Sequence, residues 1–458
     1  MIPWNSYTPE QLDTVMAFAD NYMNFISEGK TERRVTDQAL ALAAGFGYRN
    51  MNEIIFGHET LKPGDKVYFN MMGKALVLAH IGSEPLTAGM NILGAHIDSP
   101  RLDLKPRPLY EQDGFCLLDT HYYGGIKKYQ WTALPLALYG VVVLKDGTHI
   151  DVAIGDEKGD PVFVVSDLLP HLAADQMKKG ADKVVEGEQL NVTFGSIPEK
   201  GAEKDPVKAN ILKLLKDSYG IEEDDFISAE LEIVPQGRAH TCGLDKSMVL
   251  GYGQDDRSCA YPCLIAQLEC QDVKRTAVTI LTDKEEIGSV GATGAQSRFF
   301  ENFVAELLHA MGEDSPVALR RALQNSVALS NDVTAAHDPN YPEVSSPNGN
   351  MAVFGGGFTM GKYTGARGKS GSNDASAEYV ARLRKIFDDN DIVWQMSELG
   401  KVDQGGGGTI AYLLANYGMQ VIDGGVPLLN MHAPFELSSK SDLYQTKKAC
   451  LTFLQQMD

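Results

Sequence analysis

Two adjacent carboxylates, Glu285 and Glu286, follow an apolar run at residues 276–282 that has the composition of a buried parallel strand. In an open α/β sheet, ligands bind outside the carboxyl ends of the strands, so acids placed there are candidates for catalysis or metal binding. A solvated turn is the alternative for a lone pair of glutamates, because most acidic side chains are exposed. The rest of the chain must decide between these two interpretations.

Four other segments also place a histidine or an acid just after an expected strand. Together with Glu286 they form one candidate set, His96, Asp255, Glu286, Asp332 and His432. Each residue alone is more often structural, but strands lying side by side would bring the whole set to one edge of a sheet. Carboxylates mixed with imidazoles suit zinc, manganese or cobalt better than calcium, which prefers oxygen ligands. Such a set would serve two ions bridged by one carboxylate.

Asp98 lies two residues beyond His96, in the apolar strand expected at residues 91–100, which ends in polar residues. Because strand side chains alternate between faces, both side chains would project the same way. The carboxylate of Asp98 could then accept the second ring N–H of His96 and fix its tautomer.

Strands alternate with helices at both ends of the chain, which predicts an α/β fold with a mixed β-sheet flanked by helices. The early elements are a helix beginning at Thr8, a second helix from Thr36, and a hairpin at residues 66–80. Short β-like runs and turns fill residues 102–236, which we interpret as an inserted β-rich domain for dimerisation or assembly. Residues 1–101 and 237–458 would then form one discontinuous catalytic domain.

Bulk composition excludes several classes of partner. The 458 residues carry a formal net charge of −20, whereas nucleic-acid binding needs clustered lysine and arginine. The N-terminus lacks the pattern of a secretory signal, and the longest apolar stretch, Leu134 to Leu144, is too short to span a bilayer. We therefore expect a cytoplasmic protein that binds neither nucleic acid nor membrane.

Five motifs together resemble the aspartyl aminopeptidase family of dinuclear metallopeptidases. They are GAHIDSP at residues 94–100, QDDRS at 254–258, DKEEIGS at 283–289, SNDVTAAHDPNYP at 330–342 and NMHAPFE at 430–436. They occur in order across nearly the whole chain, so the resemblance is more specific than any single motif. It extends to the vacuolar aminopeptidase I type, of which this chain resembles a divergent bacterial member.

The resemblance implies a role for each member of the set. Asp255 would bridge two metal ions, most simply zinc, with His96 and Asp332 on one ion and Glu286 and His432 on the other. Glu285 would be the general base that takes a proton from a metal-bridged water. Asp98 would act beside it, and the peptide bond between Asp255 and Asp256 would be cis. The implied activity is hydrolysis of the N-terminal residue of short peptides.

The motifs also depart from the family pattern, most clearly around His337 and in the segment before Glu436. Substrate preference is therefore open between acidic and neutral N-terminal residues. An acidic preference needs a cation, and a second set of residues is the candidate for substrate binding, namely His171, Lys362, Arg367, Lys369 and Gly407. A mobile basic loop is the alternative for residues 362–369, and a solvent-facing helix position is the alternative for His171.

Related enzymes form tetrahedral dodecamers, so the resemblance implies a homo-oligomer here as well. Two other functions stay open at this point. One is a different dinuclear amidohydrolase, such as a carboxypeptidase or a deacylase. The other is a non-catalytic assembly protein on the same fold, although such a protein would usually lose ligands or base that this chain retains.

Overall fold

The computed structural model describes residues 2–346 and 348–458, which divide into two compact units. Unit 1 contains the residues up to Asp98, Ala239–Met431 and Glu436–Asp458, and unit 2 contains Ser99–Arg238 and His432–Phe435. The expected boundaries at residues 102 and 236, with their assignment to catalysis and assembly, stay a prediction. No helix among the described residues is both long and apolar enough to cross a bilayer.

A nine-stranded sheet forms the centre of unit 1, in the order β1-β2-β3-β13-β4-β14-β20-β16-β18. Strands β13, β4, β14 and β20 are parallel to one another. Strand β3 is antiparallel to both of its neighbours, and β16 is antiparallel to β20 but parallel to β18, so the predicted mixed sheet is confirmed. The strand bounds are β1 Arg49–Asn50, β2 Lys66–Met71, β3 Ala75–His80, β4 Met90–His96, β13 Thr276–Thr282, β14 Val327–Asn331, β16 Phe358–Gly361, β18 Trp394–Met396 and β20 Gln420–Gly425.

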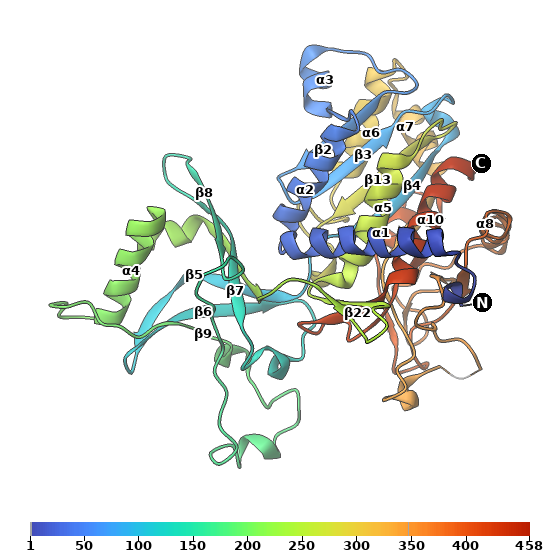
Figure 1. Ribbon diagram of the computed structural model, residues 1–458. Coiled ribbons are helices and arrows are strands. Elements are labelled where there is room, and N and C mark those ends of the chain that lie inside the picture. Colours follow the sequence, from blue (N-terminus) through green and yellow to red (C-terminus); the bar gives the residue numbers. More distant parts are fainter. Residues whose placement is uncertain (1, 347) are drawn as a thin grey trace. The chain divides into compact units, whose positions relative to one another are not determined.

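Helices cover both faces of this sheet because its central strands are apolar on both sides. Along β3, Leu76 and Leu78 pack in one core cluster, whereas Val77 and Ala79 pack in the other. Residues of α1, α2 and α5 pack in the first cluster, and in Figure 1 α1 crosses below the labels of β3, β13 and β4. The helix bounds are α1 Pro9–Glu28, α2 Glu32–Gly45, α3 Met51–Gly57, α5 Gln254–Glu269, α6 Phe299–Ala310, α7 Pro316–Gln324, α8 Ala377–Asp389, α9 Ala411–Ala415 and α10 Lys440–Gln456.

The first two helices show where capping residues set the boundaries. Helix α1 begins after Thr8, as predicted, and Thr8 and Gln11 form a capping box there. The second helix begins four residues earlier than predicted, because the Thr31 side chain accepts the backbone N–H of Arg34 and caps the helix there.

A separate five-stranded sheet in unit 1 changes the predicted arrangement of the site. Its order is β11-β12-β22-β21-β15, with bounds β11 His240–Cys242, β12 Met248–Gly251, β22 Glu436–Ser439, β21 Pro427–Leu429 and β15 Thr334–Ala335. The strand before Asp255 is β12, which pairs with β22, and His432 follows β21 rather than β20. The prediction that one sheet edge carries the whole ligand set is therefore wrong for Asp255 and His432.

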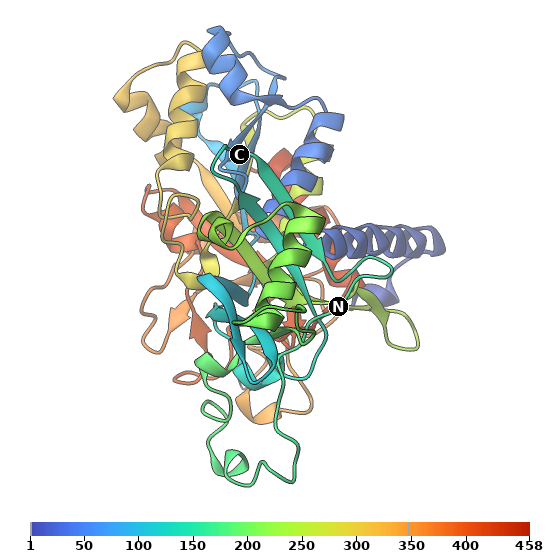
Figure 2. The ribbon, with the colours of Figure 1, turned by 90° about the vertical axis from the view of Figure 1, so that its left-hand side faces the viewer.

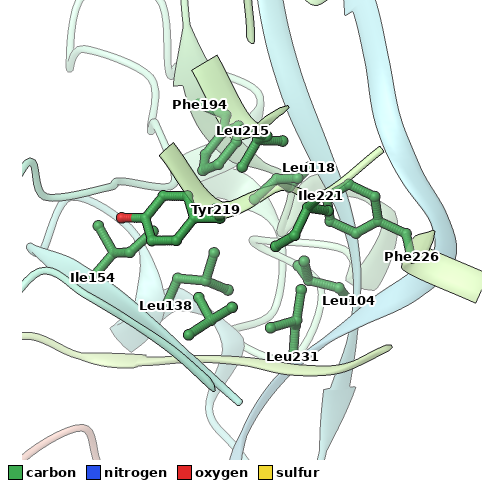
Figure 3. A pocket seen from close by; sticks show the side chains of 11 residues that line it. Leu104, Leu118, Leu138, Ile154, Phe194, Leu215, Tyr219, Ile221, Phe226 and Leu231 are labelled. Carbon is green, nitrogen blue, oxygen red and sulfur yellow. The ribbon is translucent and has the colours of Figure 1, made fainter. Parts of the chain in front are cut away.

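Unit 2 contains a six-stranded antiparallel sheet in the order β8-β7-β10-β5-β6-β9. The bounds are β5 Arg101–Gln112, β6 Phe115–Tyr123, β7 Leu136–Val143, β8 His149–Ile154, β9 Val192–Gly195 and β10 Ala229–Pro235. Helix α4, Pro206–Tyr219, packs against this sheet (Figures 1 and 2). The apolar pocket between them, drawn in Figure 3, leaves a cavity of about 10 Å³, which is room for one water at most. It is a packed core and no ligand site.

Candidate metal centre

The carboxyl ends of three neighbouring parallel strands place the first part of the site. The strand order is β13-β4-β14. His96 is the last residue of β4, Glu285 and Glu286 lie in a single 3-10 turn just after β13, and Asp332 directly follows β14. Parallel neighbours end at the same edge of a sheet, so these four side chains meet there.

The second part of the site comes from the start of α5, which follows β12 of the smaller sheet. Gly253 precedes the helix with a φ of +72°, a conformation that favours glycine, and turns the chain into the helix. Asp255 and Asp256 have non-helical backbone angles, and the peptide bond between them is cis, as predicted. Their side chains therefore leave the helix axis instead of following the helical repeat.

His96 is the side chain on which the acids converge. Its Nε2 atom lies 3.1 Å from Oδ1 of Asp255, 3.9 Å from Oδ1 of Asp332 and 3.9 Å from Oε2 of Glu285. Two overlapping groups have candidate ligand atoms all within 4.8 Å of one another, namely His96 with Asp255 and Glu286, and His96 with Asp256 and Asp332. The structure thus brings together four members of the predicted set.

Asp98 connects His96 to the pair of glutamates. Nδ1 of His96 lies 3.2 Å from Oδ1 and 3.1 Å from the carbonyl oxygen of Asp98. The same carboxylate accepts the backbone N–H of Glu285 at 3.1 Å and of Glu286 at 3.2 Å. A proton on Nδ1 would be held by Asp98, which leaves the lone pair of His96 on Nε2, facing the acids.

Asp256 lies beside His96 and Asp332, although its position in the sequence predicted no role for it. It is fully buried, and its Oδ2 accepts the backbone N–H of His96 at 3.3 Å. Its Oδ1 is buried and has no hydrogen-bond partner among the described residues. A signal did exist in the sequence, because a second acid next to Asp255 needs a partner if it is buried.

The acids and His96 shift one another's proton affinities. Burial opposes the charged form of His96, but its hydrogen bonds to Asp255 and Asp98 outweigh burial and hold its pKa well above the usual value. Burial raises the pKa of Asp256 despite the nearby His96, and the charge of Asp255 adds to that rise. Burial and the charge of Asp256 likewise raise the pKa of Asp332. Crowded buried carboxylates of this kind call for a compensating cation.

The donor set therefore fits a divalent metal. It offers one imidazole nitrogen and several carboxylate oxygens, which suits zinc. The buried Oδ1 of Asp256 is one oxygen that a cation would satisfy. Residues 25–454 match the model of the Aminopeptidase I zinc metalloprotease family, M18. This chain belongs to the M18 family. It is a metalloaminopeptidase, which sets aside the carboxypeptidase, deacylase and non-catalytic alternatives.

Relatives of this M18 enzyme match it from end to end. "Probable M18 family aminopeptidase 1" of Clostridium acetobutylicum is 58% identical and covers 98% of this chain and 97% of the relative. The crystal structure of aminopeptidase I from that organism superposes with a TM-score of 0.93 at 56% identity, covering 99% of both chains. A Thermotoga maritima M18 crystal structure gives a TM-score of 0.94 at 43% identity, covering 99% of this chain and 98% of the other.

A more distant likeness concerns the fold alone. A structure described as a dodecamer from S. cerevisiae has a TM-score of 0.76 at 21% identity, covering 95% of each chain.

His432, the remaining predicted ligand of the M18 enzyme, belongs to unit 2 by its contacts. Its Nδ1 lies 2.8 Å from the carbonyl oxygen of Gly125 in the same unit. If Nδ1 donates to that carbonyl, Nε2 carries the lone pair that a metal needs. The role of His432 as a ligand stays a prediction.

The predicted substrate-binding residues fall into two places. Strand β17, Gly365–Ala366, pairs with β19, Gly406–Gly407, which sets the basic segment beside Gly407. Within that segment the Nζ atoms of Lys369 and Lys362 lie 3.4 Å and 5.2 Å from the ring centroid of Tyr363. Arg367 is exposed.

His171 is exposed and lies in an irregular part of unit 2, so the helix position considered for it is wrong. His337 is exposed as well, and its Nδ1 lies 2.6 Å from Oγ of Ser345.

Proposed function

We propose that this M18 enzyme removes the N-terminal residue from short peptides at a centre that holds two divalent ions, with zinc favoured over manganese or cobalt. The proposed ligands are His96, Asp255, Glu286, Asp332 and His432, with Asp255 shared by both ions. One observation carries the proposal, which is the convergence of His96 with carboxylates from α5 and from the ends of β13 and β14. Such ions, when bound, polarise a scissile carbonyl and lower the pKa of water.

Glu285 is the proposed general base. Its side chain is 17% exposed, and its Oε2 lies 3.9 Å from Nε2 of His96, so it stands beside the ligands yet within reach of water. Asp98 holds the backbone of Glu285 in place through the hydrogen bond to its N–H. The carboxylate would take a proton from the attacking water and pass it to the leaving amine.

An acidic N-terminal residue is the proposed preference. Lys362, Arg367 and Lys369 lie on one short segment beside Gly407, and the two lysines approach the same ring of Tyr363. Cations gathered there would attract a substrate carboxylate, and the backbone at Gly407 would approach the peptide closely.

Assembly into a homo-oligomer, a tetrahedral dodecamer, is also proposed. The S. cerevisiae structure of similar fold is described as a dodecamer. Three leucines around His171 support an interface there, since Leu168, Leu169 and Leu172 are 52%, 50% and 69% exposed. His171 would reach a neighbouring subunit's active site. The cytoplasm is the proposed compartment.

A panel of aminoacyl reporter substrates tests the proposed activity. The purified chain is stripped with a chelator and assayed with added zinc, manganese or cobalt. We expect metal-dependent release from substrates with an unblocked N-terminus, fastest for aspartyl or glutamyl reporters. Substrates that differ only by N-acetylation are the control and should not be cleaved. Cleavage of the acetylated series alone would contradict the proposal.

A further inference from the structure

We propose that Glu436 is a positioning residue of the metal centre, which fixes the peptide unit that carries Asp255. This inference rests on the proposed metal site and adds to it a residue that is not itself a ligand. Glu436 is the first residue of β22 and is 2% exposed. Its side chain points at the start of α5.

The Oε2 atom of Glu436 accepts two backbone N–H groups, from Gln254 at 2.6 Å and from Asp255 at 3.1 Å. A carboxylate that binds backbone N–H groups at a helix start forms strong, charge-assisted hydrogen bonds and lies at the positive end of the helix dipole. The second of these bonds is made by Asp255 itself, whose Oδ1 lies 3.1 Å from Nε2 of His96. A shift of this peptide would move the proposed bridging ligand.

Neighbouring contacts hold Glu436 and the peptide unit of Asp255 in position. Strand β22 pairs with β12, and Glu436 is directly opposite Gly251. The buried side chain of Gln254 donates to the carbonyl oxygens of Glu436 at 2.6 Å and Val249 at 3.1 Å. Its Oε1 accepts hydrogen bonds from Ser438 Oγ at 2.5 Å and from the Tyr22 hydroxyl at 3.2 Å. The turn into α5 is therefore fixed both by the carboxylate of Glu436 and by the side-chain hydrogen bonds of Gln254.

Glu436 lies where the chain passes from one unit to the other. His432–Phe435 belong to unit 2, and the chain returns to unit 1 at Glu436. Glu436 and the Asp255 peptide that it binds thus lie in the same unit. Supporting groups of this kind typically change metal affinity by about 10- to 100-fold when they are removed.

Two substitutions of Glu436 separate the effect of its side-chain length from the effect of its charge. Glu436→Asp keeps the charge but withdraws the carboxylate by one methylene, whereas Glu436→Gln keeps the length and a carbonyl oxygen acceptor. Glu111→Asp is a matched control, because Oε2 of Glu111 accepts the backbone N–H groups of Val207 at 2.8 Å and Lys208 at 3.0 Å at the start of α4. That helix carries no proposed ligand.

Zinc affinity is measured by competition with a chromophoric chelator, alongside the absorption spectrum of the cobalt-loaded protein and the far-UV circular dichroism of each apo variant. We expect Glu436→Asp to lose about 10- to 100-fold in zinc affinity and to alter the cobalt spectrum. Glu436→Gln should lose less, and Glu111→Asp should bind zinc as the unsubstituted chain does.

Unchanged zinc affinity in folded Glu436→Asp would overturn the positioning role. A greater loss in Glu436→Gln than in Glu436→Asp would also overturn it, because the charge of the side chain rather than its length would then be decisive. An equal loss in Glu111→Asp would also overturn it, since a general loss of stability would then account for the effect. Failure of the unsubstituted chain to bind zinc would instead refute the proposed metal centre.

Discussion

The Oδ1 atom of Asp98 lies 3.2 Å from Nδ1 of His96, while both carboxylate oxygens of Asp98 bind backbone N–H groups of the turn that carries the two glutamates. A single side chain therefore sets the orientation of one proposed ligand and the position of the proposed base.

Asp98→Asn should weaken this arrangement without removing a ligand. The amide keeps one acceptor oxygen, but its NH₂ group would face an N–H donor or the imidazole N–H. We expect zinc affinity or kcat/KM to fall by about 10- to 100-fold. Both quantities are measured beside Asp245→Asn, an exposed aspartate that accepts hydrogen bonds from Ser247 in a turn. Equal effects of the two substitutions would contradict the assigned role of Asp98.

Asp256→Asn should keep or raise the Tm of the metal-free protein but reduce the rise in Tm that zinc causes. The substitution removes a buried charge whose pKa is raised by burial, so the Tm of the metal-free protein should be at least as high as before. The zinc-dependent rise in Tm should shrink, because one negative oxygen near His96 is lost. Thermal unfolding with and without zinc measures both. An unchanged rise would exclude Asp256 from the centre.

The sequence predicted the strands that hold most of the site, and the structure explains what it could not predict. Residues 276–282 form β13 as predicted, whereas β4 ends at His96, earlier than the strand predicted at residues 91–100. The sheet to which β12 belongs is decided by its pairing with β22, in which Gly251 faces Glu436. The local sequence pattern of β12 does not indicate that its partner is β22, which is far away in the sequence.

The omission of Asp256 has a local physical cause. Helical periodicity at the start of α5 predicts side chains that follow a regular repeat, so only one of two adjacent acids would face a site. The backbone there departs from helical angles at Asp255 and Asp256, and both carboxylates reach the surroundings of His96. A departure of this kind cannot be predicted from apolar spacing.

Substitution of the basic segment should change substrate preference more than turnover. In Lys362→Ala, removal of one cation should raise KM for an aspartyl reporter by about tenfold, while kcat/KM for a leucyl reporter stays within about twofold. Lys385→Ala is the control, since Lys385 is an exposed lysine of α8 that pairs with Asp389. Equal losses for both reporters would refute a role for Lys362 in recognising acidic residues.

The stability of the protein should fall as the pH rises towards 8, in part because of Asp442. Burial raises the pKa of Asp442 to about 8, even though its carboxylate accepts the backbone N–H groups of Gly355 at 2.8 Å and Gly357 at 2.7 Å. The folded state then holds a proton that the unfolded state has released above a pH of about 4. Folding is therefore favoured at low pH, and this contribution is lost as the pH rises through the folded pKa.

Urea unfolding of wild type and Asp442→Asn at pH 5 and pH 8.5, both metal-free, measures this dependence. The substitution also costs hydrogen-bond energy, but that cost is similar at both pH values and cancels in the comparison. The free energy of unfolding should fall less with pH in Asp442→Asn than in wild type. Equal falls would show that Asp442 ionises in the folded state as easily as in the unfolded one.

In the proposed mechanism Glu285 moves the proton while its neighbour Glu286 and the other acids hold the metal, and Glu285→Gln tests this division of roles most directly. Zinc content per chain and turnover of the preferred aminoacyl reporter are measured on the same preparation. We predict that the variant binds as much zinc as wild type, two ions per chain, while kcat falls by about two to four orders of magnitude. Near-normal turnover with full zinc content would contradict the assignment of the base.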